Sequence, residues 1–260
     1  MDLDLRDRVF LVTGGSAGLG LAGARALTAE GARVVIAARD TEQVEQAVAE
    51  FEPGSAIGLQ ADLAEPSVAA RLTEAAQAHF GRIDGSLVSV GGPPPGTALG
   101  VDDRSWTDAF QSVFLGPLRI ARAIAGALPA NAASPVGTTG SVLLVLSTSA
   151  FSPIPDLAIS NGLRPGLAML TKQLADELGP RGIRVNAIAP GRFATERVRS
   201  LDASRGDPHL VRQQFESAIP LGRYGEPDEF GALAAFILSP RASYLTGTVV
   251  TLDGGASRQP

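Results

Sequence analysis

The segment RVFLVTGGSAGLG, residues 8–20, joins a short apolar run to a cluster of glycines. The apolar run predicts a buried strand, and small and apolar residues at helical spacing over 19–30 predict a helix directly afterwards. Gly14, Gly18 and Gly20 allow a tight turn and let backbone N–H groups approach a pyrophosphate at the helix N-terminus. Because the glycines stand between a strand and a helix, the segment favours a nucleotide-binding turn over a purely structural one.

The rest of the chain repeats this alternation of apolar runs and helical patterns. Continuous apolar strands separated by helices indicate a parallel sheet that is covered on both faces. We therefore expect an α/β protein with a Rossmann-type, doubly wound, seven-stranded parallel sheet, built as a single domain over residues 1–260. The predicted strands are 8–15, 32–39, 55–63, 85–92, 140–147, 183–190 and 247–255.

Composition excludes several classes of function. The chain has 22 basic and 27 acidic residues, so no excess of positive charge supports a nucleic-acid or anionic-membrane partner. Without cysteine and with two histidines, it offers no thiolate chemistry and no multi-histidine metal site. No apolar run reaches the roughly 18 residues of a membrane span. The charged start MDLDLRDR lacks a signal-peptide core, so we expect a cytoplasmic protein without a metal.

The end of the second predicted strand bears on cofactor choice. In dinucleotide sites an acid near this point holds the ribose 2′-hydroxyl, whereas an arginine accommodates a 2′-phosphate. Here Arg39 follows Ala38, and Asp40 lies one step further on. Arg39 favours NADP(H) over NAD(H), although a solvated loop charge is the alternative. Asp62, after the third strand, is suited to accept a hydrogen bond from the adenine amine. The alternative is that it is an acid near a helix N-cap.

Two segments interrupt the alternation. GGPPPGTALG, residues 91–100, predicts a stiff loop because its three prolines fix the backbone and remove N–H donors. Residues 192–217 are rich in charge and follow the sixth strand. We interpret them as a mobile lid over a ligand cleft.

These motifs together resemble the short-chain dehydrogenase/reductase family, most closely the bacterial 3-oxoacyl-carrier-protein reductases and their relatives. TGGSAGLG matches the family's Thr-Gly-x-x-x-Gly-x-Gly, ADL matches its adenine-contacting acid, and the segment after 189 matches its Pro-Gly-x-x-x-Thr. The resemblance implies that Thr195 and the backbone near Ile188 hold the nicotinamide amide. It also implies a small-molecule substrate and a homo-oligomer, a tetramer or a dimer. The cofactor-binding residues expected are Thr13, Gly14, Ser16, Gly18, Leu19, Gly20, Arg39, Asp62, Leu63, Gly91, Arg164, Pro190, Gly191 and Thr195.

The active site departs from this family pattern. The family uses Asn, Ser, Tyr and Lys, and in this register only Ser147 survives. Ser160 stands at the tyrosine position, Arg164 at the lysine position and Val113 at the asparagine position. The family's Asn-Asn-Ala-Gly run is also altered, to Ser-Val-Gly-Gly over 89–92. We take Ser147, Ser160 and Arg164 as the candidate catalytic residues.

These substitutions remove the family's proton-transfer groups. A serine hydroxyl is a far weaker acid than tyrosine, and an arginine, with a pKa above about 12, cannot relay a proton as lysine can. Ser160 and Arg164 share one helix face at i and i+4, and Asn161 adds an amide, which favours a retained polar pocket. Three other residues could replace the proton donor: Asp156, His209 and Tyr224. They are weaker candidates, because Asp156 suits the N-cap region of a helix and the other two suit surface or packing roles.

The sequence therefore leaves three functions open. The first is an NADP(H)-dependent oxidoreductase that transfers a hydride at a non-standard site. The alternative is a non-catalytic nucleotide-binding sensor or oligomer subunit on the same fold. A lyase or isomerase is the third, and no residue supports it positively. Loss of a general acid typically costs 10²–10⁴-fold in rate, so slow turnover of an activated carbonyl remains compatible with the first.

Overall fold

The computed structural model describes residues 2–128 and 139–258 of the chain. Seven parallel strands form one sheet in the order β3-β2-β1-β4-β5-β6-β7, which confirms the predicted doubly wound α/β class. The strands are β1 Val9–Thr13, β2 Arg33–Ala38, β3 Ala56–Gln60, β4 Gly85–Val88, β5 Gly140–Val145, β6 Ile183–Pro190 and β7 Val249–Leu252.

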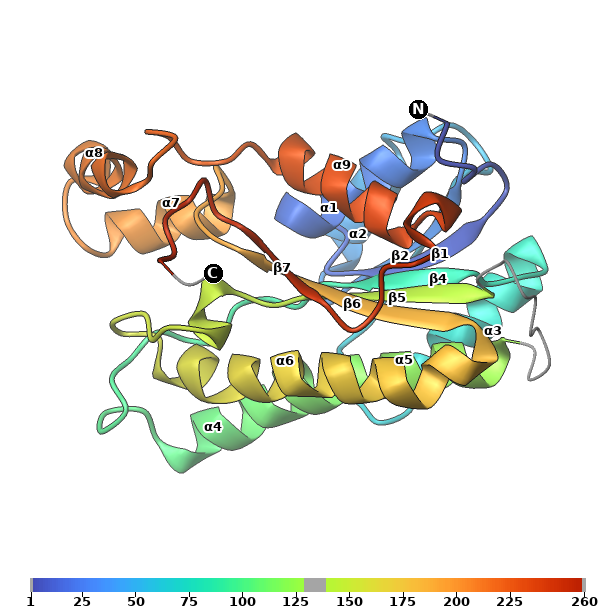
Figure 1. The fold of residues 1–260 in the computed structure, drawn as a ribbon, viewed down its shortest axis with the longest axis horizontal. Coiled ribbons are helices and arrows are strands. Elements are labelled where there is room, and N and C mark those ends of the chain that lie inside the picture. The colour runs from blue at the N-terminus through green and yellow to red at the C-terminus, as the bar shows by residue number, and fades with distance from the viewer. Residues whose placement is uncertain (1, 129–138, 259–260) are drawn as a thin grey trace.

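Helices cover both faces of the sheet (Figure 1). One buried cluster joins the sheet to α3, α5 and α6, and a second joins it to α1, α2 and α9. The longer helices are α1 Gly18–Ala29, α2 Thr41–Val48, α3 Val68–Phe80, α4 Asp103–Ala109, α5 Gly116–Ala127, α6 Ala158–Leu178, α7 Glu196–Ala203, α8 Pro208–Ala218 and α9 Pro227–Leu238. A π-helical turn, η1 Phe110–Leu115, joins α4 to α5, and short 3₁₀ turns occur at η2 Thr148–Ala150, η3 Gly179–Arg181 and η4 Pro240–Ala242.

The strand order reverses between β1 and β4, since the chain passes from β1 outward to β3 and then returns to the other side of β1. Ligands of open α/β sheets bind outside the carboxyl ends of the strands at such a point. The strand β4 ends at Val88, four residues earlier than the predicted run, because residues 89–92 leave the sheet. They then form one wall of the space at this switch point.

The helix that carries Ser160 and Arg164, α6, begins at Ala158. Asp156 has a positive φ of 62°, and its carbonyl accepts the N–H of Gly96 at 2.7 Å. Leu157 occupies the N-cap and makes no side-chain capping bond. Asp156 therefore lies in the N-cap region, one residue before the N-cap itself, and its backbone belongs to the bridge between two loops.

The charged segment 192–217 folds into two helices at one end of the sheet, α7 and α8, drawn in orange (Figure 1). Thr195 caps α7, and Asp207 caps α8 ahead of Pro208 at the first helical position. These local signals give the segment regular structure. We keep the name lid for residues 192–217.

Candidate active site and cofactor cleft

A cleft of about 1040 Å³ opens at the carboxyl ends of β1, β2 and β4. The glycine turn, the end of β2 and the loop after β4 form its walls, together with part of α4 and η1. It lies at the switch point of the sheet, where a doubly wound fold binds its ligand. The predicted residues that line it are Thr13, Gly14, Ser16, Arg39, Asp62, Leu63 and Gly91.

The glycine turn is packed too closely to accept larger residues. Gly14 has a φ of 57°, and a Cβ there would lie 2.8 Å from the carbonyl oxygen of Ser89. A Cβ on Gly20 would collide with the carbonyl oxygen of Gly14. The first turn of α1 has no side-chain cap and no acidic residue. Its N–H groups and the positive end of the helix therefore remain available to a phosphate, so the turn fits a dinucleotide.

The two charges after β2 have different roles. The Arg39 side chain is exposed and forms no ion pair or hydrogen bond with any residue that the structure describes. Its Nη2 lies 3.9 Å from the position that a Cβ on Gly91 would take, so it reaches across the cleft. Asp40 instead caps α2, where its Oδ1 accepts the N–H of Gln43 at 3.0 Å. The carboxylate thus has an internal partner, while the guanidinium has none.

Asp62 lines the cleft next to Leu63, just after the end of β3, which pairs with β2. Its Oδ1 accepts the N–H of Ala64 at 2.9 Å, which fixes the orientation of the carboxylate. Leu63 is 8% exposed, and its backbone lies so close to Gly116 that a Cβ there would be 2.9 Å from the Leu63 carbonyl oxygen. Both positions are therefore held rigidly at the edge of the cleft.

Three serines meet at the start of α6 and the end of β5. The Ser160 hydroxyl is buried and lies 2.9 Å from the Ser149 hydroxyl. Ser147 Oγ accepts the N–H of Ser149 at 3.1 Å. Because Ser147 uses only an acceptor position in this contact, its own proton remains available to another oxygen. Ser149 was not predicted, and only its place two residues after Ser147 could have suggested it.

Arg164 is buried, with 5% of its surface exposed, and its Nη1 donates to the carbonyl of Val145 at 2.7 Å. Its Nε has no partner, and no carboxylate pairs with the guanidinium among residues 2–128 and 139–258. Burial lowers the pKa of Arg164 to about 10. The side chain is still a cation at neutral pH.

Val113 belongs to a buried apolar cluster with Ala109, Ile159 and Leu163. It lies in the π-helical turn η1, a distortion that is common beside functional sites. A valine side chain has no polar group with which to hold a water or a substrate oxygen. Asn161, expected to add an amide to the pocket, bonds instead to both backbone groups of Ile154 at 2.9 Å each.

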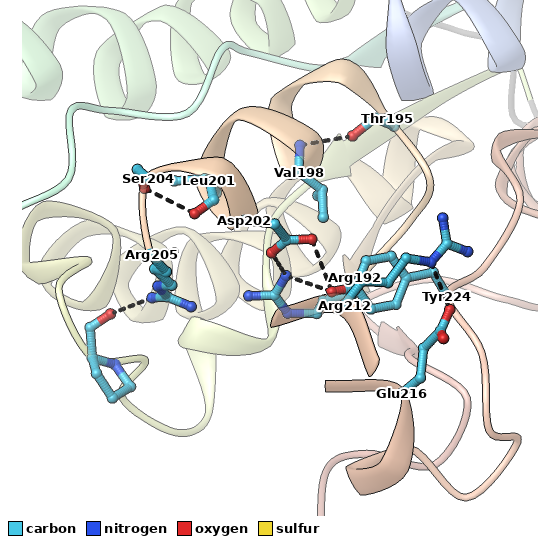
Figure 2. A network of polar contacts seen from close by, with 11 residues as sticks. Arg192, Thr195, Val198, Leu201, Asp202, Ser204, Arg205, Arg212, Glu216 and Tyr224 are labelled. Carbon is cyan, nitrogen blue, oxygen red and sulfur yellow. Dashed lines mark hydrogen bonds and ion pairs between the residues drawn. The ribbon is translucent and has the colours of Figure 1, made fainter. Parts of the chain in front are cut away.

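Tyr224 belongs to a polar network that joins the lid to the end of β6 (Figure 2). Its hydroxyl donates to Asp202 Oδ2 at 2.9 Å and accepts from Arg192 Nη1 at 3.0 Å. Desolvation and the bond to Asp202 raise the pKa of Tyr224 to about 12, which makes it a poor proton donor. His209 is exposed at the start of α8. No replacement acid emerges among these candidates.

The remaining predicted residues lie outside the lining of the cleft. Gly191 lies so close to the last strand that a Cβ there would be 2.6 Å from the Cβ of Asp253. Thr195 uses its hydroxyl to cap α7, and its Cγ2 lies 3.6 Å from the Cβ position of Gly18. The structure therefore brings the start of the lid to the glycine turn. The others outside the lining are Gly18, Leu19, Gly20, Ser147, Ser160, Arg164 and Pro190.

No group of three or more His, Cys, Asp or Glu residues within 2–128 and 139–258 is placed to hold a metal ion. In the same part of the chain, no helix is both long and apolar enough to cross a bilayer.

The fold defines an α/β protein of the doubly wound class, with a cleft at the switch point of its sheet. A family model described as enoyl-(acyl carrier protein) reductase matches residues 14–257. The chain belongs to the short-chain dehydrogenase/reductase family, whose characterised relatives here are oxidoreductases.

Individual relatives cover nearly the whole chain. An uncharacterized oxidoreductase of Mycobacterium tuberculosis is 35% identical over 96% of this chain and 92% of its own length. The 3beta-hydroxysteroid dehydrogenase 1 of Eggerthella lenta is 35% identical over 99% and 96%. Among solved structures, L-sorbose reductase from Gluconobacter frateurii, complexed with NADPH and L-sorbose, superposes with a TM-score of 0.89 at 26% identity, covering all of both chains.

Proposed function

We propose that this protein is an NADP(H)-dependent oxidoreductase that interconverts a carbonyl and an alcohol without the family's tyrosine and lysine. The observation that carries the proposal is the cleft itself: a glycine turn with free N–H groups faces an unpaired Arg39. A guanidinium fork matches phosphate geometry, and no described carboxylate competes for it. The relative solved with NADPH supports the same cofactor class.

Within this proposal the chain's own groups have separate roles. Thr13, Gly14, Ser16, Asp62 and Gly91 bind the cofactor at the walls of the cleft. A bound reduced nicotinamide would supply a hydride to the carbonyl carbon. Ser147 donates its free proton as a hydrogen bond to the carbonyl oxygen, which orients the substrate.

Protonation of the product oxygen is the step for which this chain lacks a strong acid. The buried cation of Arg164 lowers the energy of negative charge that develops nearby, because a positive group in a dry site acts at low dielectric. Solvent water then delivers the proton. We therefore propose Ser147 and Arg164 as the principal catalytic side chains, with the Ser160 hydroxyl holding Ser149 in place.

Calorimetric titration of the purified protein with NADPH and NADH tests the cofactor assignment. We expect NADPH to bind at least tenfold more tightly, because one charge-assisted hydrogen bond contributes about 1.5–3 kcal/mol. Arg39→Ala should remove most of this difference and leave the NADH affinity unchanged. Equal affinities in the wild-type protein would contradict the role of Arg39, and no binding of either nucleotide would overturn the whole proposal.

Ser147→Ala tests the substrate contact. We expect kcat/KM to fall about tenfold on a responsive carbonyl, because a neutral hydrogen bond contributes about 0.5–1.5 kcal/mol. Steady-state oxidation of NADPH measures the change. Ser152→Ala, an exposed serine five residues further along the same segment, is the matched control and should equal the wild type. A Ser147→Ala enzyme with unchanged kcat/KM would show that the substrate does not use this hydroxyl.

A nucleotide-binding protein without turnover is the second candidate. Ser160 and Arg164 favour it, since each has an internal partner, Ser149 and the Val145 carbonyl respectively. It predicts tight NADPH binding with no oxidation of the cofactor across a broad panel of aldehydes and ketones. Turnover of any of these compounds above the uncatalysed rate would exclude it.

A further inference from the structure

The first turn of α7 lies between two walls of the cleft. On one side Thr195 Cγ2 lies 3.6 Å from the Cβ position of Gly18, in the glycine turn. On the other side Arg197 Nη2 and Nε lie 2.9 and 3.0 Å from the Cβ position of Gly92, in the loop after β4. Gly92 lines the cleft. Residues 195–197 of the lid therefore extend from the glycine turn to the opposite wall.

The charge of Arg197 has no ionic partner among the residues that the structure describes. Its Nη2 donates to the neutral carbonyl of Pro93 at 2.8 Å. Three other arginines of the lid have carboxylate partners: Arg192 with Asp202, Arg199 with Glu196 and Arg212 with Glu216. Arg205 also donates to a neutral carbonyl, that of Pro155, which is not part of the cleft lining. A cation that faces a cleft wall without a carboxylate is suited to an anionic ligand, since a guanidinium binds phosphate oxygens more strongly than a neutral carbonyl.

Arg39 approaches the same loop from the other direction. Its Nη2 lies 3.9 Å from the Cβ position of Gly91, the residue next to Gly92. Two guanidinium groups without an ion pair therefore approach consecutive residues of one cleft wall, Arg39 from the end of β2 and Arg197 from the lid. Arg39 lies at the position that reads the ribose 2′-substituent. Arg197 lies on the wall opposite the glycine turn, and Thr195, two residues before it, lies against that turn, where the diphosphate is bound in this fold.

We propose that Arg197 is a diphosphate-binding residue, and that it exchanges the Pro93 carbonyl for a cofactor phosphate when the dinucleotide enters. This inference rests on the proposed nucleotide-binding function. It makes the lid part of the cofactor site, so that binding of the diphosphate holds α7 over the cleft. The exchange breaks one hydrogen bond to a neutral oxygen and forms one or two to a charged oxygen.

Binding measurements on three variants test this role without any need for turnover. Wild type, Arg197→Ala, Arg197→Lys and the control Arg199→Ala are titrated with NADPH, with ADP and with adenosine 2′-monophosphate. Arg199 lies on the same helix, is exposed and pairs with Glu196, so its removal leaves the cleft unchanged. Thermal unfolding of each variant verifies that the fold is retained.

We expect Arg197→Ala to weaken the binding of NADPH and of ADP about tenfold or more. The affinity for adenosine 2′-monophosphate should not change, because this compound lacks the diphosphate. The affinity of Arg197→Lys for NADPH and ADP should lie between those of the wild type and Arg197→Ala, since lysine keeps the charge but lacks the two-pronged guanidinium. If Arg197→Ala binds NADPH as tightly as Arg199→Ala, the inference is overturned while the proposed function stands. Tighter binding would also overturn it, by showing that the Pro93 contact only obstructs the cleft. A wild-type protein that binds none of the three compounds rejects both proposals.

Discussion

Gly20→Ala is expected to abolish measurable NADPH binding and to lower the free energy of unfolding by about 3 kcal/mol. A Cβ at this position collides with the carbonyl oxygen and carbon of Gly14, which are backbone atoms that no side-chain rotation can move. Helix α1 must then move away from the glycine turn. The N–H groups at its first turn leave the position from which they meet a phosphate, so binding is lost together with stability.

Gly126→Ala is the matched control for this variant. It is also a helical glycine, near the end of α5, but nothing lies within 4 Å of its Cβ position. An alanine there should raise the free energy of unfolding by about 0.5–1 kcal/mol, because alanine loses less backbone entropy than glycine in a helix. Urea unfolding and calorimetric titration measure both variants. If Gly20→Ala binds NADPH with wild-type affinity, the close packing of α1 on the turn is irrelevant to the cofactor.

Asp202→Ala is expected to lower the free energy of unfolding by about 3–5 kcal/mol, the usual effect of removing one partner from a buried ion pair. Asp202 is 3% exposed and accepts from Arg192 Nη1 at 2.5 Å and from the Tyr224 hydroxyl at 2.9 Å (Figure 2). The Arg192 guanidinium also lies 3.3 Å from the ring centroid of Phe215 in α8. The carboxylate thus connects β6, both lid helices and the segment before α9, and its removal leaves a cation without a counter-charge.

The same helix provides the control. Glu196→Ala removes an exposed carboxylate that pairs with Arg199, and surface pairs of this kind contribute at most about 1 kcal/mol. Urea unfolding compares the two variants, and the rate of tryptic cleavage within 192–217 reports unfolding of the lid by itself. If Asp202→Ala is no less stable than Glu196→Ala in either measurement, the network does not hold the lid.

Much of the fold follows from local patterns in the sequence. Period and composition predict the seven strands, and the glycines after β1 predict the turn and the start of α1. The strand ends are less well predicted, as for β4, because residues 89–92 are apolar or small enough to continue a strand. They leave the sheet through contacts with β1 and the glycine turn, where the Thr13 hydroxyl donates to the Ser89 carbonyl at 2.7 Å.

The candidate site divides in the same way. Residues that act through the backbone, such as Gly14 and Gly20, are identifiable because a glycine requirement is set by nearby chain geometry. The hydrogen-bond partners of side chains cannot be identified in this way. The partners of Asn161, Tyr224 and Arg197 are Ile154, Asp202 and Pro93, and the last two lie 22 and 104 residues away along the chain.

By itself, the sequence determined the doubly wound class, and it predicted the glycine turn after β1 and the candidate site residues Ser160 and Arg164. Only the tertiary structure decided that Arg39 is unpaired while Asp40 caps a helix, that Arg164 bonds to the end of β5, and that the lid begins against the glycine turn. The physical reason is the distance along the chain over which each effect acts. Hydrophobic period and turn chemistry act over a few residues, whereas the partner of a polar side chain depends on how distant elements pack together.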